Sequence, residues 1–202
     1  TGGSTHANQA IILALGKPGD KIAISRTAHR SVISALVLSG LEPIWLTPEI
    51  DQASGFPIGI SLAELERVLE HKPIAIFLTE PGYLGTLSDL QVLITKAHEH
   101  SIPVVIDSAW GGHFGIHIDL PKNVLQLGAD ALITSVHKAL PGYSASALLL
   151  ARTNLLSADR LEQSFETTHT TSPAGAPLAS IDGCRALLQT RGDELTGQLL
   201  KN

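Results

Sequence analysis

Lys138 is the residue of this 202-residue chain whose setting is best suited to covalent chemistry. It follows an apolar run, in the segment Ser135-Val136-His137-Lys138. A lysine at the mouth of a cleft can lose hydration, which lowers the pKa of its amine and makes it a nucleophile able to form an imine. Taken alone, Lys138 is better explained as a surface lysine in a loop, so its function depends on its surroundings.

Asp107 is a second candidate, because it ends the apolar run Val104-Val105-Ile106 in the segment PVVIDSAWGGHFG. A carboxylate at the end of a buried strand is held rigidly and has little water around it. The alternative interpretation is a helix cap or a turn former for Ser108 and the residues after it. Both interpretations remain open on this residue alone.

The segment Gly2-Gly3-Ser4-Thr5 could bind a phosphate, because it leads into a predicted helix whose free amides and dipole attract anions. It matches neither GxxxxGK nor GxGxxG behind a strand, and an ordinary serine cap is the simpler alternative. His29 follows another apolar run and opens a predicted helix with Arg30. A capping or merely exposed histidine is the default interpretation there.

Other chemistries find less support in the sequence. His113 and His117 lie four residues apart near two aspartates, but the segment is glycine-rich, lacks the HExxH glutamate and offers no clear third ligand. We therefore expect no metal site. No GxSxG motif marks a serine nucleophile. The single cysteine, Cys184, can form neither an internal disulfide nor a CxxC site, and it fits a reducing cytoplasm.

Short apolar runs alternate with helical patterns and so predict the elements that position these residues. The predicted strands cover residues 21–25, 43–46, 74–79, 104–107, 131–135 and 145–151. The predicted helices cover residues 5–15, 29–39, 61–70 and 88–100, followed by 154–165, 176–188 and 193–200. The alternation predicts an α/β fold, a three-layer sandwich with a mostly parallel central sheet.

Two features of this sheet follow from the spacing. Strands 131–135 and 145–151 are separated by too few residues for a helical crossover, so we expect them to be antiparallel or not adjacent. In an open α/β sheet, ligands bind outside the carboxyl ends of the strands. Asp107 and Lys138 both lie at such ends, which favours a shared site.

Six segments carry these candidates and their neighbours: GGSTHANQA, SRTAHRSVISALVLSG, TEPGYLGTLSDL, VVIDSAWGGHFGIHIDLP, LGADALITSVHKALPGYSASALLL and ETTHTTSP. In this order they resemble the prokaryotic ornithine/lysine/arginine decarboxylase family of pyridoxal-phosphate (PLP) enzymes, which has the aspartate-aminotransferase-like fold. The resemblance implies that residues 1–152 are most of a cofactor-binding major domain. Residues 153–202 would be a helical continuation toward a small domain outside this chain, so we expect a part of a longer protein.

The resemblance also implies a role for each candidate residue. Lys138 would hold PLP as a Schiff base, and Asp107 would pair with the pyridinium nitrogen and keep it protonated. His29 would lie over the face of the cofactor ring. The residues implied to bind the phosphate are Ser4, Thr5, Ser135 and His137, and further cofactor contacts are implied for Gly3 and Ala109.

The expected partners follow from the resemblance and from composition. Thr171 or Ser172, in the ETTHTTSP segment, would reach the phosphate of a neighbouring subunit, which implies a homodimer or a dimer-based oligomer. Hydrophobic residues make up 44% of the chain and charged residues only 16%, which favours a large interface. The net charge of −5 and the lack of a basic tract argue against nucleic acid, and no apolar run is long enough for a membrane span.

The expected function is the decarboxylation of arginine, lysine or ornithine to the corresponding amine and carbon dioxide, in the cytoplasm. The sequence departs from the Asp-Glu-Ala-His that the resemblance leads us to expect, because Asp107-Ser108-Ala109-Trp110 places an indole where a histidine would stand. An indole cannot exchange protons. Two alternatives therefore stay open: another PLP reaction such as transamination or elimination, or a fragment without turnover that binds cofactor or a partner.

Overall fold

The computed structural model describes residues 1–201, which form a six-stranded sheet with helices around it. The strand order is β2-β1-β5-β6-β7-β8, and every neighbouring pair is parallel except β7 and β8, which are antiparallel. The strands are β1 (Lys21–Ser25), β2 (Glu42–Leu46), β5 (Ile76–Thr79), β6 (Val104–Asp107), β7 (Ala131–Ser135) and β8 (Ala147–Ala151). The helices are α1 (Gly3–Leu15), α2 (Arg30–Ser39), α3 (Leu62–Leu69), α4 (Leu90–Glu99), α5 (Ala158–Thr168) and α6 (Gly175–Leu199).

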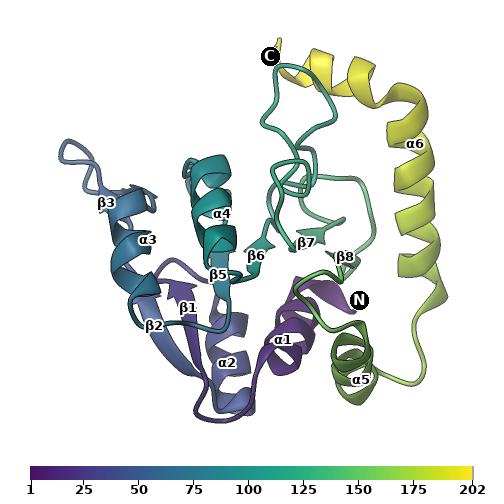
Figure 1. Cartoon of the computed structure of the whole chain (residues 1–202). Coiled ribbons are helices and arrows are strands. Elements are labelled where there is room, and N and C mark those ends of the chain that lie inside the picture. The colour runs from purple at the N-terminus through teal and green to yellow at the C-terminus, as the bar shows by residue number, and fades with distance from the viewer. Residues whose placement is uncertain (202) are drawn as a thin grey trace.

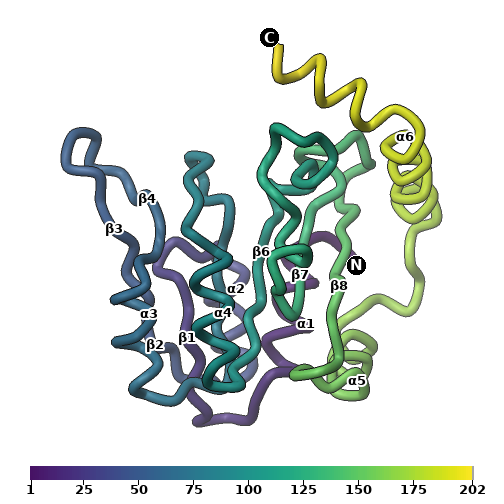
Figure 2. The backbone as a smooth tube through the Cα atoms, turned by 45° about the horizontal axis from the view of Figure 1, so that its top comes forward, coloured from purple at the N-terminus to yellow at the C-terminus, as the bar shows by residue number. Residues whose placement is uncertain are grey.

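Helices cover both faces of the sheet, as Figures 1 and 2 show. Successive residues of a strand point to opposite faces, and β5 illustrates this alternation. Ile76 packs in the core shared with α3 and α4, whereas Phe77 packs in the core shared with α1 and α2. The predicted three-layer α/β sandwich with a mostly parallel sheet is therefore confirmed.

The central strands are continuous apolar runs because both of their faces are covered. β6 and β7 are buried along their whole length. Their observed bounds are the predicted ones, and so are those of β1. The polar residue that ends each run, Asp107 on β6 and Ser135 on β7, is held by the buried strand before it.

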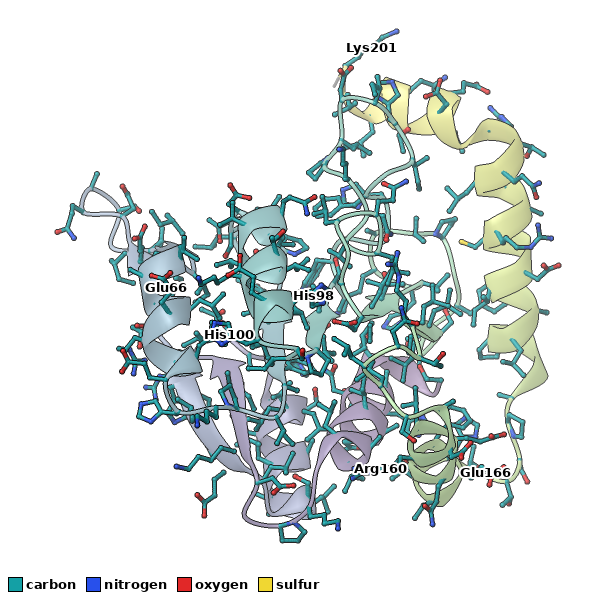
Figure 3. All side chains as sticks on the ribbon, viewed as in Figure 1. Glu66, His98, His100, Arg160, Glu166 and Lys201 are labelled. Carbon is teal, nitrogen blue, oxygen red and sulfur yellow. The ribbon has the colours of Figure 1, made fainter. Side chains whose placement is uncertain are left out.

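Segments distant in sequence meet at the β8 edge of the sheet. Gly2 forms an isolated antiparallel bridge with Ser146, and the Thr1 amino group donates to the Ala147 carbonyl at 3.0 Å. α5 packs against α1, where Arg160 Nη2 donates to the carbonyl of Gly16 at 2.7 Å (Figure 3). These contacts place the start of α1 beside β8.

A small hairpin and the helix α6 differ from the prediction. The hairpin of β3 (Glu49–Ile50) and β4 (Pro57–Gly59) was not predicted, because its strands are two and three residues long. α6 is one helix where two were predicted, and Figure 1 shows it bending in its C-terminal part. A Cβ on Gly192 would lie 2.8 Å from Ile116 Cγ2, so this glycine allows close packing and does not end the helix.

The start of α4 also differs from the prediction. Asp89 caps this helix, because its carboxylate accepts a hydrogen bond from the Val92 amide at 3.2 Å. Ser88, the predicted start, instead turns its hydroxyl toward Glu80. No helix within residues 1–201 is long and apolar enough to cross a membrane.

Candidate functional site

A cavity of about 250 Å³ opens at the carboxyl ends of β5, β6 and β7, beside the N-terminus of α1. The residues around it come from segments between positions 2 and 145. All of the cofactor-contacting residues predicted from the sequence line this one cavity: Gly3, Ser4, Thr5, His29, Asp107, Ala109, Ser135, His137 and Lys138. The fold thus brings together residues that the chain keeps far apart.

Asp107 forms the buried floor of the cavity, with 3% of its surface exposed. Its Oδ2 accepts a hydrogen bond from Asn8 Nδ2 at 2.8 Å, and its Oδ1 accepts one from the Ala109 amide at 3.1 Å. Burial raises the pKa of the carboxyl group, while these hydrogen bonds and the nearby charges of Lys138 and His29 oppose that rise. Of the two alternatives, the helix cap is wrong, since no helix follows β6, but Asp107 does form a turn there through its hydrogen bond from the Ala109 amide.

Asn8 is a site residue that the sequence reasoning missed. It lies on the buried face of α1, and its amide nitrogen donates to both Asp107 and the hydroxyl of Ser31, the latter at 3.0 Å. The other atom of that amide, Oδ1, is buried and has no hydrogen-bond partner. The signal in the sequence was a polar amide among the alanines and isoleucines of an apolar helix face.

The N-terminus of α1 forms one wall of the cavity. The N-cap position is Gly2, and it offers no side-chain acceptor to the first amides of the helix. The alternative of an ordinary serine cap is therefore wrong: Ser4 lies within the first turn, and its hydroxyl is 2.7 Å from that of Ser135. Gly3 has a φ of +86°, a conformation that favours glycine. Free amides and two hydroxyls at a helix start are suited to a phosphate.

His29 is both a cap and a wall of the cavity. Its Nδ1 accepts a hydrogen bond from the Ser31 amide at 3.2 Å and lies 2.8 Å from the Ser31 hydroxyl, so it is the N-cap of α2. Because Nδ1 accepts, the proton of the neutral ring is on Nε2. Asn8, Ser31 and His29 thus form a chain of hydrogen bonds that begins at Asp107.

Lys138 lies in the turn after β7, at the mouth of the cavity. The side chain is exposed, contrary to the expectation of a desolvated amine. Its Nζ is 4.7 Å from the centroid of the Trp110 ring, which is a cation–π contact. In the same turn, His137 Nδ1 is 2.7 Å from the carbonyl of Ser146 and donates to it, since a carbonyl oxygen can only accept.

Thr171 and Ser172 do not belong to this cavity. They are exposed in the segment between α5 and α6 and are absent from its lining. The histidines considered for a metal lie elsewhere as well, with His117 Nδ1 3.7 Å from Asp119. Within residues 1–201, no group of three or more His, Cys, Asp or Glu side chains could hold a metal ion.

Comparison with known proteins identifies the fold and the family of the chain. The chain matches the structure of YbdL from Escherichia coli, described as having a methionine aminotransferase function, with a TM-score of 0.75 and 20% identity over 98% of this chain and 53% of that one. The architecture is therefore that of the aminotransferase large domain. A family model described as "Orn/Lys/Arg decarboxylase, major domain" matches residues 1–202, so this chain belongs to the Orn/Lys/Arg decarboxylase family.

Two relatives show how much of a longer protein is present. The chain is 38% identical over 201 residues to an arginine decarboxylase of Bacillus subtilis (strain 168), an alignment that covers 98% of this chain and 41% of the relative. It is 37% identical over 190 residues to the uncharacterized protein YaaO of the same organism, covering 93% of this chain and 40% of the relative. The chain thus spans about two fifths of the length of these relatives.

The residues of the cavity fit PLP, the cofactor of this family and fold. The free amides of α1 with Ser4 and Ser135 suit its phosphate, and the buried carboxylate of Asp107 suits its ring nitrogen. Two buried polar atoms of the lining, Asn8 Oδ1 and Thr79 Oγ1, have no hydrogen-bond partner within the described chain. Such atoms are typical of a site that a polar ligand completes.

Proposed function

We propose that the protein containing this chain uses PLP to decarboxylate a basic amino acid, arginine, lysine or ornithine, to the corresponding amine. The observation that carries the proposal is that the predicted cofactor residues line a single cavity, with Asp107 at its floor and Lys138 at its mouth. Membership of the family supports the reaction type. The name of the similar Bacillus subtilis protein, arginine decarboxylase, supports the substrate class.

When bound, PLP supplies an electron sink for the electron pair released at the substrate α-carbon. The residues of this chain hold that group and set its charge. Lys138 would attach it covalently, and the amides of α1 with Ser4 and Ser135 would hold its phosphate. Asp107 would hold a proton on the ring nitrogen, and Asn8 fixes the orientation of that carboxylate through its 2.8 Å hydrogen bond.

His29 and Trp110 line the cavity and would restrict the space around the cofactor. The hydrogen bonds between His29 and Ser31 hold the imidazole at the start of α2, where it can lie over the cofactor ring. Trp110 contacts the Lys138 amine, and its indole N–H can donate a hydrogen bond but is too weak an acid to transfer a proton, so Trp110 would act by position and shape. The proton that replaces the carboxylate must therefore come from another group.

A panel of amino acids assayed for carbon dioxide release, with the full-length protein and added PLP, tests the reaction. We expect release from arginine, lysine or ornithine and no stimulation by a 2-oxo acid. Borohydride reduction followed by peptide mapping should place the pyridoxyl group on Lys138. Pyridoxyl modification of a different lysine would refute the site.

The Trp110 indole favours one second candidate, a PLP reaction such as transamination or elimination. Stoichiometric pyridoxamine phosphate, with no carbon dioxide from any of the three amino acids, would support transamination and refute decarboxylation. A protein that traps PLP but converts none of the amino acids would support a binding role without turnover.

We also propose a homodimer or a dimer-based oligomer in the cytoplasm. Thr171 and Ser172 are exposed and outside the cavity of their own chain, which leaves them free to reach a neighbouring subunit. Sedimentation of the full-length protein should show a dimer or larger species at working concentrations. Full activity of a monomer at high dilution would contradict this arrangement.

A further inference from the structure

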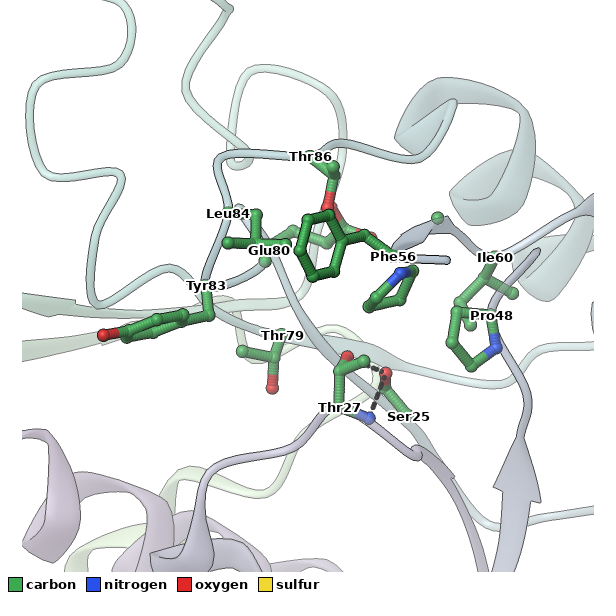
Figure 4. Close-up of a pocket in the computed structure, with 13 residues that line it drawn as sticks. Ser25, Thr27, Pro48, Phe56, Ile60, Thr79, Glu80, Tyr83, Leu84 and Thr86 are labelled. Atoms are coloured by element: carbon green, nitrogen blue, oxygen red, sulfur yellow. Dashed lines mark hydrogen bonds between the residues drawn. The ribbon is translucent and has the colours of Figure 1, made fainter. Parts of the chain in front are cut away.

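A second cavity, of about 370 Å³, lies next to the candidate cofactor site. The β3–β4 hairpin, the loop after β5 and the end of β1 enclose it (Figure 4). Thr79 lines both cavities, and its buried Oγ1 has no hydrogen-bond partner. Tyr83 of the second cavity packs edge-on against Trp110 of the first, with ring centroids 6.4 Å apart. The two cavities are therefore direct neighbours.

The wall of the second cavity is mostly apolar. Phe56, Pro57, Ile60 and Leu84 contribute hydrocarbon surface, and Figure 4 shows Phe56 and Leu84 on the side where Glu80 lies. A cavity of this kind binds an alkyl chain well, because it removes that chain from water. It offers few polar groups, so any polar group within it determines which ligand fits.

Glu80 is the one carboxylate in the lining of this cavity, and only 4% of its surface is exposed. Its oxygens accept hydrogen bonds from the Ser88 hydroxyl at 2.5 Å and the Ser88 amide at 3.2 Å. A carboxylate has about four acceptor positions, so about two remain. No ion pair within residues 1–201 involves Glu80.

A buried carboxylate without a cation is unfavourable in its charged form. Burial accordingly raises the pKa of Glu80 to about 6, and the two hydrogen bonds from Ser88 oppose that rise only in part. A cation entering the cavity would supply the missing partner. A ligand with a neutral apolar side chain would leave the Glu80 carboxylate without a partner of opposite charge.

We infer that this cavity binds the side chain of the substrate, with its alkyl part against the apolar wall and its terminal ammonium or guanidinium group on Glu80. This inference rests on the proposed function, since it requires that the α-carbon of the same molecule lie at the neighbouring cofactor site. It makes Glu80 the residue that selects a basic amino acid over an uncharged one of similar length.

Glu80→Gln in the full-length protein tests the inference, because it removes the charge and keeps an acceptor for Ser88. We expect KM for the preferred basic amino acid to rise by roughly ten- to a hundredfold, the usual effect of a lost hydrogen bond to a charged group. We expect the borohydride-trapped pyridoxyl group on Lys138 to be unchanged. Ser88→Ala is the matched control, because it removes a hydrogen bond of Glu80 and leaves the charge. An unchanged KM in Glu80→Gln, or an equal rise in Ser88→Ala, would overturn the inference.

A second pair of variants covers the case in which Glu80→Gln fails to fold. Leu84 is half-exposed at this cavity, so Leu84→Lys should fold and bring a competing cation near Glu80. We expect a higher KM in Leu84→Lys than in Leu84→Gln, which changes the same position without charge. Equal values for the two variants would overturn the inference.

Direct binding separates this inference from the proposed reaction. Cadaverine and pentylamine differ by one terminal cation, and each can be titrated into the PLP-loaded full-length protein. Tighter binding of cadaverine that is lost in Glu80→Gln would support the cavity assignment even if no amino acid were decarboxylated. Equal binding of both amines by the parent protein would overturn the assignment even if carbon dioxide were released.

Discussion

The buried Glu80 carboxyl group gives a prediction about stability that needs neither cofactor nor substrate. Its pKa is about 6 in the folded chain against an ordinary value of 4.5, because burial disfavours the charged form. The folded state therefore holds this proton more tightly than the unfolded state. Stability from this group is present below about pH 4.5 and is lost as the pH rises to about 6 and beyond.

The size of the effect follows from the difference between the two pKa values. At 1.36 kcal/mol per pKa unit, it amounts to about 2 kcal/mol over the full range. Between about pH 5 and pH 7.5 the change is about 1 kcal/mol, because part of the titration lies below that range. Glu80→Gln has no titrating group at this position, so its stability lacks this pH dependence. Between about pH 5 and pH 7.5, the free energy of unfolding of the variant minus that of the parent should therefore increase by about 1 kcal/mol.

Urea unfolding, followed by the fluorescence of Trp45 and Trp110, measures this difference across a pH series under reversible conditions. Only the change with pH of the variant–parent difference in unfolding free energy is interpreted, so any pH-independent effect of the glutamine on packing cancels. Glu162→Gln, at an exposed position of α5, is the matched control for the loss of one glutamate. A difference between Glu80→Gln and parent that stays constant with pH, or that favours the parent at high pH, would refute the reasoning.

Three further substitutions test the cofactor site. Lys138→Ala should abolish pyridoxyl trapping and change the free energy of unfolding by only about 0.5 kcal/mol, because the side chain is exposed; mass spectrometry and urea unfolding check both. Asp107→Asn should lower kcat by orders of magnitude yet retain PLP absorbance, since an amide cannot keep the ring nitrogen protonated and the phosphate contacts are separate; turnover within a few-fold of the parent would remove Asp107 from the mechanism. Asn8→Ala should destabilise the chain by about 1 to 3 kcal/mol, because it leaves buried acceptors unpaired, and equal unfolding midpoints would contradict that role.

Local sequence patterns predicted the central strands and much of the site, for one physical reason. A strand covered on both faces must be apolar until it leaves the core, so the first polar residue marks both the end of the strand and the edge of the sheet. Asp107 was found in this way, and Lys138 was found because it lies just past the strand 131–135; the structure places both at the cavity. The role of Ser135 was implied only by the family resemblance. The phosphate-binding role of the α1 start required the family resemblance, because glycines and hydroxyls before a helix also suit an ordinary cap.

The parts that sequence reasoning missed depend on contacts between distant segments. Asn8 gains its role from Asp107, which lies 99 residues further along the chain, and no local pattern records that pairing. Glu80 follows a buried strand, but the sequence reasoning assigned it no role. It shares its cavity with the hairpin of β3 and β4, whose strands are too short to show a period. The cavity beside it was therefore invisible in the sequence.

The long-range hydrogen bonds of the site also bear on the order of folding. Asn8 and Asp107 are 99 residues apart, and Ser4 and Ser135 are 131 apart, so neither bond exists until α1 has docked on a nearly complete sheet. Contacts of such sequence separation require the closure of long loops and are slow to form. The proposed cofactor PLP would then bind only late, to a chain already close to its native state. The bound cofactor would stabilise the native state and slow its unfolding, but it would have little effect on the folding rate.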